Sequence, residues 1–172
     1  MRNLVLSVIG DDRPGLVSAL ADAVASHGGN WERGQLAHLA GKFAGIVVVA
    51  VSAEQADELI GAVTGLDGLL EVAVHDAGAG ASRTSEWAGL TIGVLGNDRA
   101  GIVQELSAAL SSSGVSIEKM TTGTREAPMA GGMLFEAQFE VLVPPSADLA
   151  VIRGDLERIA EELLVDLGID GS

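Results

Sequence analysis

The sequence predicts two α+β domains in tandem, each with the order strand, helix, strand, strand, helix, strand. The first observation is an internal repeat. Residues 4–31 (LVLSVIGDDRPGLVSALADAVASHGGNW) align without a gap with residues 90–117 (LTIGVLGNDRAGIVQELSAALSSSGVSI), and 11 of 28 positions are identical. The second is that each copy alternates short apolar runs with segments of helical periodicity. The 172 residues are therefore expected to form two related domains.

The repeat also places the domain boundaries. Residue 4 aligns with residue 90, which gives a period of 86 residues, and a stretch of small and polar residues, AGAGASRTSEW, separates the two copies. We predict a first domain at residues 1–76, a linker at 77–87 and a second domain at 88–172.

In the first copy, the strand LVLSVI precedes a helix whose apolar positions follow a period of 3.6 residues: Leu16, Val17, Leu20, Ala21 and Val24. The sequence HGG ends that helix, and two strands then flank Gly41 as a hairpin. A second apolar-faced helix and the strand LLEVAVH complete the copy. The expected strands are 4–9, 30–40, 43–51 and 69–75. The first expected helix starts within the sequence DDRPG and ends before HGG, and the second is 53–64.

The second copy repeats this order. The expected strands are 90–95, 115–125, 133–143 and 165–169, the expected helices are 101–113 and 149–163, and the looser turn EAPMAGG joins the middle strands. Two right-handed crossovers and one hairpin give a ferredoxin-like (βαββαβ) sandwich, in which both helices cover one face of a four-stranded antiparallel sheet.

One strand differs between the copies. Residues 133–143 alternate between apolar and polar, with Phe135 and Phe139 on one side and Glu136 and Glu140 on the other, which predicts one buried and one wet face. The corresponding run IVVVAV in the first copy is apolar on both faces. Either its second face packs on another domain or subunit, or the run reflects only the β-propensity of a protein rich in alanine and valine.

Composition excludes several classes of function. The formal net charge is −14 and only five residues are aromatic, which disfavours direct binding of nucleic acid. The chain has no cysteine, its three histidines show no metal-ligand spacing, and no apolar stretch is long enough for a membrane helix. We expect a cytoplasmic protein without a metal site, a cofactor or a membrane segment.

The most informative motif is the hexapeptide GDDRPG at 10–15, repeated as GNDRAG at 96–101. Each lies where the first strand of a copy becomes a helix, and a helix N-terminus presents unpaired N–H groups that bind a carboxylate. Gly15 and Gly101 would let a ligand approach, and nearby carboxylates and amides would accept from an ammonium group. These groups would suit both ends of a free α-amino acid.

A purely structural role explains the same residues. Asp12 and Asp98 have side chains that are common N-caps, and Pro14 is expected in the first helical turn. The closing glycine would then serve only the packing of helix against strand. Capping by the aspartates is favoured over direct contact with a ligand, although the loop backbone could do both.

The two hexapeptides in their strand-to-helix context resemble the ACT domain, a ferredoxin-like module that usually binds amino acids and regulates metabolism. Two such units without an enzyme, together with GNW and LAGKFAG after the first helix, resemble the glycine cleavage system transcriptional repressor family. The resemblance implies ligand sites between paired domains, each formed by the loop after the first strand and by the start of the second strand of the neighbour. The residues implied are Asp11, Asp12, Arg13, Gly15, Leu16 and Asn30 in the first copy, and Asn97, Asp98, Arg99, Gly101, Ile102 and Ser116 in the second.

The resemblance also implies a function. Asn30 matches the asparagine that many amino-acid-binding ACT domains carry there, whereas Ser116 departs from it, so the second site is expected to bind differently, weakly or not at all. We expect a regulatory dimer that binds a free amino acid, with glycine or serine as candidates, and that acts on transcription only through a DNA-binding regulator. The alternatives are an interaction module that needs no ligand and an enzyme, but the sequence contains no catalytic motif.

Overall fold

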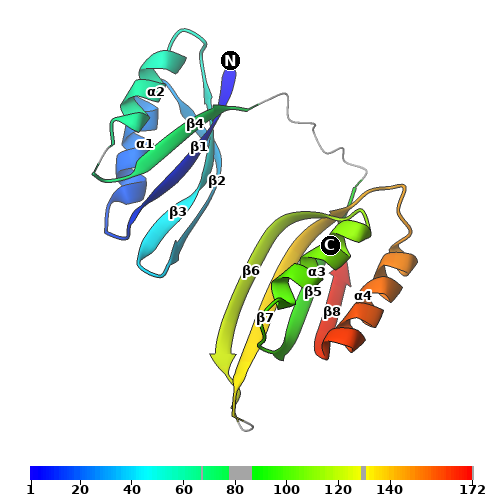
Figure 1. Ribbon diagram of the computed structural model, residues 1–172. Helices are drawn as coiled ribbons and strands as arrows, with labels where there is room; N and C mark the ends of the chain where they lie inside the picture. The colour runs from blue at the N-terminus through cyan, green and yellow to red at the C-terminus, as the bar shows by residue number, and fades with distance from the viewer. Residues whose placement is uncertain (67, 78–86, 129–130, 172) are drawn as a thin grey trace. The chain divides into compact units, whose positions relative to one another are not determined.

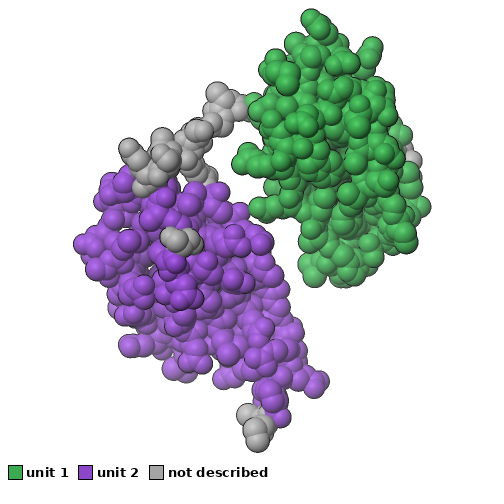
Figure 2. Space-filling view, turned by 180° about the vertical axis from the view of Figure 1, so that it is seen from behind, with its two compact units in different colours: residues 1–80 green, residues 81–172 purple. Residues whose placement is uncertain are grey.

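The chain folds as two units in the computed structural model, Met1–Gly80 (unit 1) and Ala81–Ser172 (unit 2), which Figure 2 shows in green and purple. The structure describes residues 1–66, 68–77, 87–128 and 131–171, so most of the predicted linker at 77–87 lies outside the described residues.

Unit 1 forms a four-stranded antiparallel sheet in the order β2-β3-β1-β4, with both helices on one face (Figure 1). Its elements are β1 (Arg2–Asp11), α1 (Leu16–Ser26), β2 (Asn30–Leu39), β3 (Lys42–Val51), α2 (Ala56–Thr64) and β4 (Glu71–Asp76). The helix α2 begins three residues later than expected, because Ser52 starts a turn instead: its carbonyl and hydroxyl oxygens both accept from the N–H of Gln55, at 3.2 and 3.3 Å.

Unit 2 repeats the architecture with sheet order β6-β7-β5-β8. Its elements are β5 (Ala88–Asn97), α3 (Ile102–Ser112), β6 (Ser116–Glu126), β7 (Met133–Val143), α4 (Leu149–Leu163) and β8 (Val165–Gly171). The prediction of an α+β protein with two ferredoxin-like units is therefore confirmed.

Each core lies between the sheet and its two helices. In unit 1, Leu4, Leu6 and Val8 of the central strand β1 point toward the helices and are at most 3% exposed. In unit 2, Phe139 of β7 is fully buried. The alternation along these strands gives each sheet one covered face and one face without helices, which we call the bare face.

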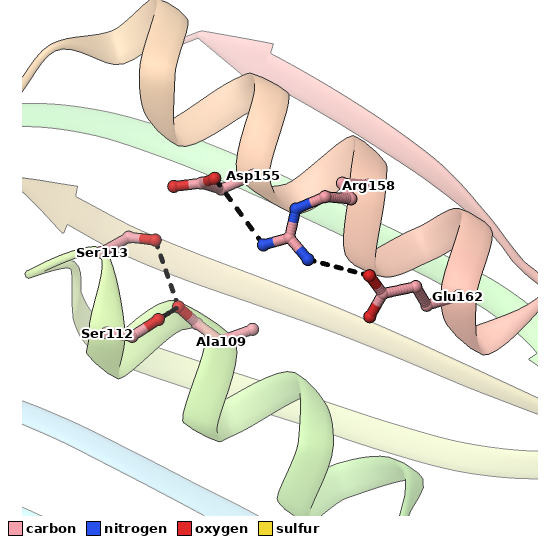
Figure 3. Close-up of polar contacts among 6 residues, drawn as sticks. All are labelled: Ala109, Ser112, Ser113, Asp155, Arg158 and Glu162. Carbon is pink, nitrogen blue, oxygen red and sulfur yellow. Dashed lines mark hydrogen bonds and ion pairs between the residues drawn. The ribbon is translucent and has the colours of Figure 1, made fainter.

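The surfaces of the unit 2 helices are polar and locally paired. The Arg158 guanidinium donates to Glu162 at 2.9 Å and lies 3.8 Å from a carboxylate oxygen of Asp155, all on α4 (Figure 3). At the end of α3, the hydroxyls of Ser112 and Ser113 donate to the Ala109 carbonyl. These contacts satisfy the hydrogen-bonding capacity of groups at the helix end and on the helix surface, and none of them indicates a ligand site.

The bare faces of the two units differ in chemistry, in line with the difference between their sequences. In unit 1 the bare face is largely apolar, and Ile46 at its centre is 53% exposed. Strand register places Val5, Ser7, Ile9, Ala44, Ile46 and Val48 on its two central strands, and Arg33, Gln35, Glu71, Ala73 and His75 on the edge strands β2 and β4. In unit 2 the bare face is hollowed, with a volume of about 690 Å³, and is lined by polar residues and glycines, including Thr91, Gly93, Thr121, Gln138, Asp166 and Gly168.

The covered face of β1 can be tested with a matched pair of substitutions. Leu4→Ala should lower the free energy of unfolding of unit 1 by about 2–5 kcal/mol, because Leu4 is 0% exposed and its truncation leaves a cavity. Leu39→Ala should change it by less than about 0.5 kcal/mol, because Leu39 is 77% exposed. Urea unfolding followed by Trp31 fluorescence in a Trp87→Phe background measures unit 1 alone. Equal effects of the two substitutions would contradict the assigned core.

Candidate functional site

Both hexapeptides end in a glycine that forms the N-cap of the following helix in a left-handed conformation. Gly15 has φ 92° and ψ −2°, and Gly101 has φ 87° and ψ −7°. Residues other than glycine rarely adopt such angles. The helices then begin at Leu16 and Ile102, both 3% exposed, so that the turn is fixed to the core immediately after the glycine.

The expectation that Asp12 and Asp98 cap these helices is wrong. The N-cap lies three residues further on, at the glycine, and among the residues that the structure describes no side chain caps either helix. The backbone N–H of Asp12 instead donates to the Gly41 carbonyl at 3.0 Å, and that of Asp98 donates to the Met133 carbonyl at 2.8 Å. Both aspartates thus continue the pairing of the strand and do not cap the helix.

Two further structural expectations are also wrong. Pro14 precedes the N-cap and lies outside the first helical turn. Beyond its chain neighbours, a Cβ on Gly15 would meet no atom of the described residues within 4 Å, so this glycine is not required by packing of helix against strand. Close packing occurs at the opposite end of each hexapeptide. A Cβ on Gly10 would lie 2.5 Å from the Leu69 carbonyl oxygen, and a Cβ on Gly96 would lie 2.5 Å from Val165 Cγ1.

The charged side chains of the first turn all have partners within unit 1. The Lys42 ammonium donates to Asp11, and this hydrogen bond, reinforced by the attraction of opposite charges, lowers the pKa of Asp11 and raises the pKa of Lys42. His38 Nε2 lies 3.6 Å from Asp12 Oδ2. The Arg13 guanidinium donates to the carbonyl of Gly68 in the loop between α2 and β4.

The second turn is arranged differently. Its Arg99 guanidinium makes two hydrogen bonds to the carboxylate of Glu105, at 2.8 and 2.7 Å. The hydrogen bonds lower the pKa of Glu105 and raise the pKa of Arg99. Asp11 pairs with Lys42 in unit 1, whereas Asn97 pairs with Leu134 in unit 2. Unit 2 therefore has no cation at the position that corresponds to Lys42.

A hollow of about 270 Å³ lies at the first turn. It is lined by Asp12, Arg13, Gly15 and Leu16, four of the residues that the resemblance implies, and also by Val17, Ser18 and Phe43. The last three were not expected, although each lies within a few residues of the hexapeptide or opposite it in the hairpin. Unpaired N–H groups of the first turn of α1 and the nearby guanidinium of Arg13 make the hollow suitable for a small carboxylate.

Asn30 does not lie at this hollow. It pairs with Ala50 of β3, whereas Asp11 pairs with Lys42, eight positions earlier in the same strand and hence about 26 Å away at ~3.3 Å per residue. Unit 2 has the same arrangement, because Ser116 pairs with Leu142 and Asn97 pairs with Leu134. Within one unit, therefore, the structure separates the two halves of each implied site.

Other kinds of site find no support in the described part of the chain. Among residues 1–66, 68–77, 87–128 and 131–171, no group of three or more histidine and acidic side chains is placed to hold a metal ion. No helix formed by these residues is long and apolar enough to cross a membrane.

Comparison with known proteins points to one family. The family model described as the ACT domain matches residues 2–75 and 89–170, that is, both copies of the repeat. A search of curated proteins found no match.

Two solved structures resemble the whole chain. The first, an unknown protein from Galdieria sulphuraria, has a TM-score of 0.87 and 28% identity, over 99% of this chain and 98% of that one. The second is a protein provisionally named a glycine cleavage system transcriptional repressor, with a TM-score of 0.76 and 13% identity, over 99% of this chain and 97% of that one. At that identity, the second likeness concerns the fold alone.

The conformation of the turn can be tested with two glycines of unit 1. Gly15→Ala should lower the free energy of unfolding of unit 1 by about 1–2 kcal/mol, because alanine is strained at φ 92°. Gly61→Ala in α2 should raise it by about 0.5–1 kcal/mol, because a Cβ there would meet no described neighbour within 4 Å and alanine favours a helix. The readout is again urea unfolding followed by Trp31 fluorescence. Stabilisation by Gly15→Ala would contradict the left-handed turn.

Proposed function

Because the chain belongs to the ACT domain family, we propose that the protein is a regulator that binds a free amino acid at the hollow of unit 1, with glycine and serine as the first candidates. The observation that carries the proposal is the hollow itself, where the N-terminus of α1, the Gly15 turn and Arg13 meet. Its volume of about 270 Å³ suits a small molecule, and its donors suit a carboxylate.

In this proposal the two ends of the amino acid have separate partners. The α-carboxylate accepts from the first N–H groups of α1 and from Arg13, whose present partner is the neutral carbonyl of Gly68. The ammonium group faces Asp12, which lines the same hollow. Gly15 presents no side chain to the ligand, and Leu16 closes the base of the hollow against the core.

Asn30 would then be supplied by a second copy of the chain. Asn30 and the hexapeptide lie at opposite ends of the sheet, so a two-fold axis that reverses the direction of the strands would place Asn30 of one copy near the turn of the other. Such an arrangement gives two equivalent sites per dimer and links ligand binding to assembly.

The proposed action is regulatory and indirect. A net charge of −14 disfavours contact with DNA, so an effect on transcription would pass through a DNA-binding partner protein. The likeness in fold to a protein provisionally named a glycine cleavage system transcriptional repressor supports glycine as the first ligand to test. Neither turn places a nucleophile beside a base, which supports a role in binding over one in catalysis.

A second candidate is an assembly module that needs no ligand. The observation in its favour is the apolar bare face of unit 1, where Ile46 is 53% exposed. In a strongly acidic chain, the apolar centre of this face, formed by Val5, Ile9 and Val48, is a place where two copies can meet with few charges in contact, because Glu71 and Arg33 lie on its edge strands. We propose this face as the dimer interface in either case.

Ligand binding is tested by titrating the ¹⁵N-labelled full chain with glycine and with serine. The amide signals of residues 11–18 should shift, and Arg13→Gln should weaken binding about tenfold or more by removing a charged donor. Arg99→Gln is the matched control and should leave binding at unit 1 unchanged. A mixture of Asn30→Ala and Arg13→Gln chains should recover part of the binding that each variant loses, because a mixed dimer contains one intact site. If no amino acid shifts these amides, the ligand-independent module is the better description.

The interface is tested by sedimentation with substitutions at corresponding positions of the two bare faces. Ile46→Lys should shift the chain toward the monomer, because it places a charge in the centre of the apolar face. Gln138→Lys, at the equivalent position of unit 2, should leave the oligomeric state unchanged. A dimer that survives Ile46→Lys would show that the bare face of unit 1 is not the interface.

A further inference from the structure

The second turn already has a carboxylate bound to it, and that carboxylate belongs to the chain itself. Glu105 lies in the first turn of α3, four residues after Gly101, and receives both hydrogen bonds of Arg99. Such a two-point contact between a guanidinium and a carboxylate is the one expected for a bound acid ligand.

The position of this carboxylate relative to the turn is also specific. Glu105 Oε1 would lie 3.7 Å from a Cβ built on Gly101, and outside Gly101 and its chain neighbours no other atom of the described residues lies within 4 Å of that point. At Gly15 the same construction meets no atom within 4 Å of the described chain, and the hollow of unit 1 lies beside it. In the alignment of the two copies, the position of Glu105 is taken by Ala19, which has no carboxylate to offer.

A difference in loop length explains why the two arginines have different partners. In unit 1, residues 65–70 join α2 to β4, and the Gly68 carbonyl in this loop accepts from Arg13. In unit 2, Leu164 alone joins α4 to β8, so the chain provides no corresponding loop carbonyl. Arg99 therefore turns to Glu105, the acidic residue of the first turn of α3.

We propose that Glu105 acts as a built-in ligand that occupies the carboxylate position of the second turn, so that the chain binds one amino acid, in unit 1, and none in unit 2. The proposal rests on the proposed function of the first turn. It differs from the expectation based on Ser116, because it names a residue that fills the site. The helix N-terminus adds to the effect, since a negative charge is favoured there.

Stability alone gives little reason for this ion pair. The side chains of Arg99 and Glu105 are 40% and 45% exposed, so that solvent screening keeps the contribution of the pair to folding small, although its two-point geometry makes it stronger than most surface ion pairs. The effect of removing Glu105 should therefore appear in binding, with little change in unfolding.

The test uses acetate, a bare carboxylate, and follows the amide signals of both turns in the ¹⁵N-labelled full chain. In the native sequence, acetate should shift the amides of residues 16–18 and leave those of 102–104 unchanged. In Glu105→Ala, acetate should also shift residues 102–104, with an affinity at least about tenfold higher than in the native sequence. Ala19→Glu should abolish the response of residues 16–18. Glu161→Ala, which removes an exposed charge from α4, is the control and should behave as the native chain.

The outcomes separate this inference from the proposed function. If acetate fails to shift residues 102–104 in Glu105→Ala, or shifts them equally in the native chain, Glu105 does not occupy the site and the inference is overturned. If the acetate pattern is as expected but neither glycine nor serine binds to any variant, the role of Glu105 stands and the proposed amino-acid ligand is wrong. Circular dichroism of each variant verifies that the fold is retained.

Discussion

The central strand of each sheet determines where everything else in the unit lies. In unit 1, β1 is hydrogen-bonded on both sides, to β3 and to β4, while Leu4, Leu6 and Val8 anchor one of its faces beneath the helices. Because β3, β4 and the helices all hold β1 in place, the position of its C-terminal end is fixed. The chain must leave that end in a turn tight enough to start α1 directly above the sheet, and the left-handed Gly15 makes such a turn possible.

The duplicated framework separates what the fold requires from what varies. Both units keep the left-handed glycine, the close approach at the first glycine of the hexapeptide and the buried residue that starts the helix. The polar contacts around the turn have diverged: Lys42 and the Gly68 carbonyl hold the first turn, and Glu105 holds the second. The bare faces have diverged as well, one apolar and one hollowed and polar.

Much of the architecture could be predicted from the sequence because two copies carry the same pattern. The repeat, the apolar periodicities and the glycine positions were sufficient for the element order and for the place of both turns. That Asp12 and Asp98 do not cap the helices could not be predicted, because the sequence does not show that their backbones remain paired with Gly41 and Met133. Favourable side-chain chemistry at these positions was outweighed by backbone hydrogen bonds between strands.

The polar partners of the turns were missed for a related reason. Lys42 faces Asp11 only through the exact register of the hairpin, and Glu105 reaches Arg99 only because α3 begins at Ile102. The distance between Asn30 and the hexapeptide follows from the same register. The hexapeptide precedes α1 and Asn30 follows it, and the two lie at opposite ends of the sheet. Long-range pairing thus decides what surrounds a motif that is recognisable locally.

The exposure of Glu105 has an evolutionary consequence. After a duplication, two copies of a regulatory module usually begin with the same ligand and the same response, and one of them can be released from selection for binding. Alanine and glutamate codons differ by a single nucleotide, and an exposed position in the first turn of a helix accepts either residue without disturbing the core. One copy could therefore lose its dependence on the ligand in a single mutational step while it continued to serve as a folded scaffold.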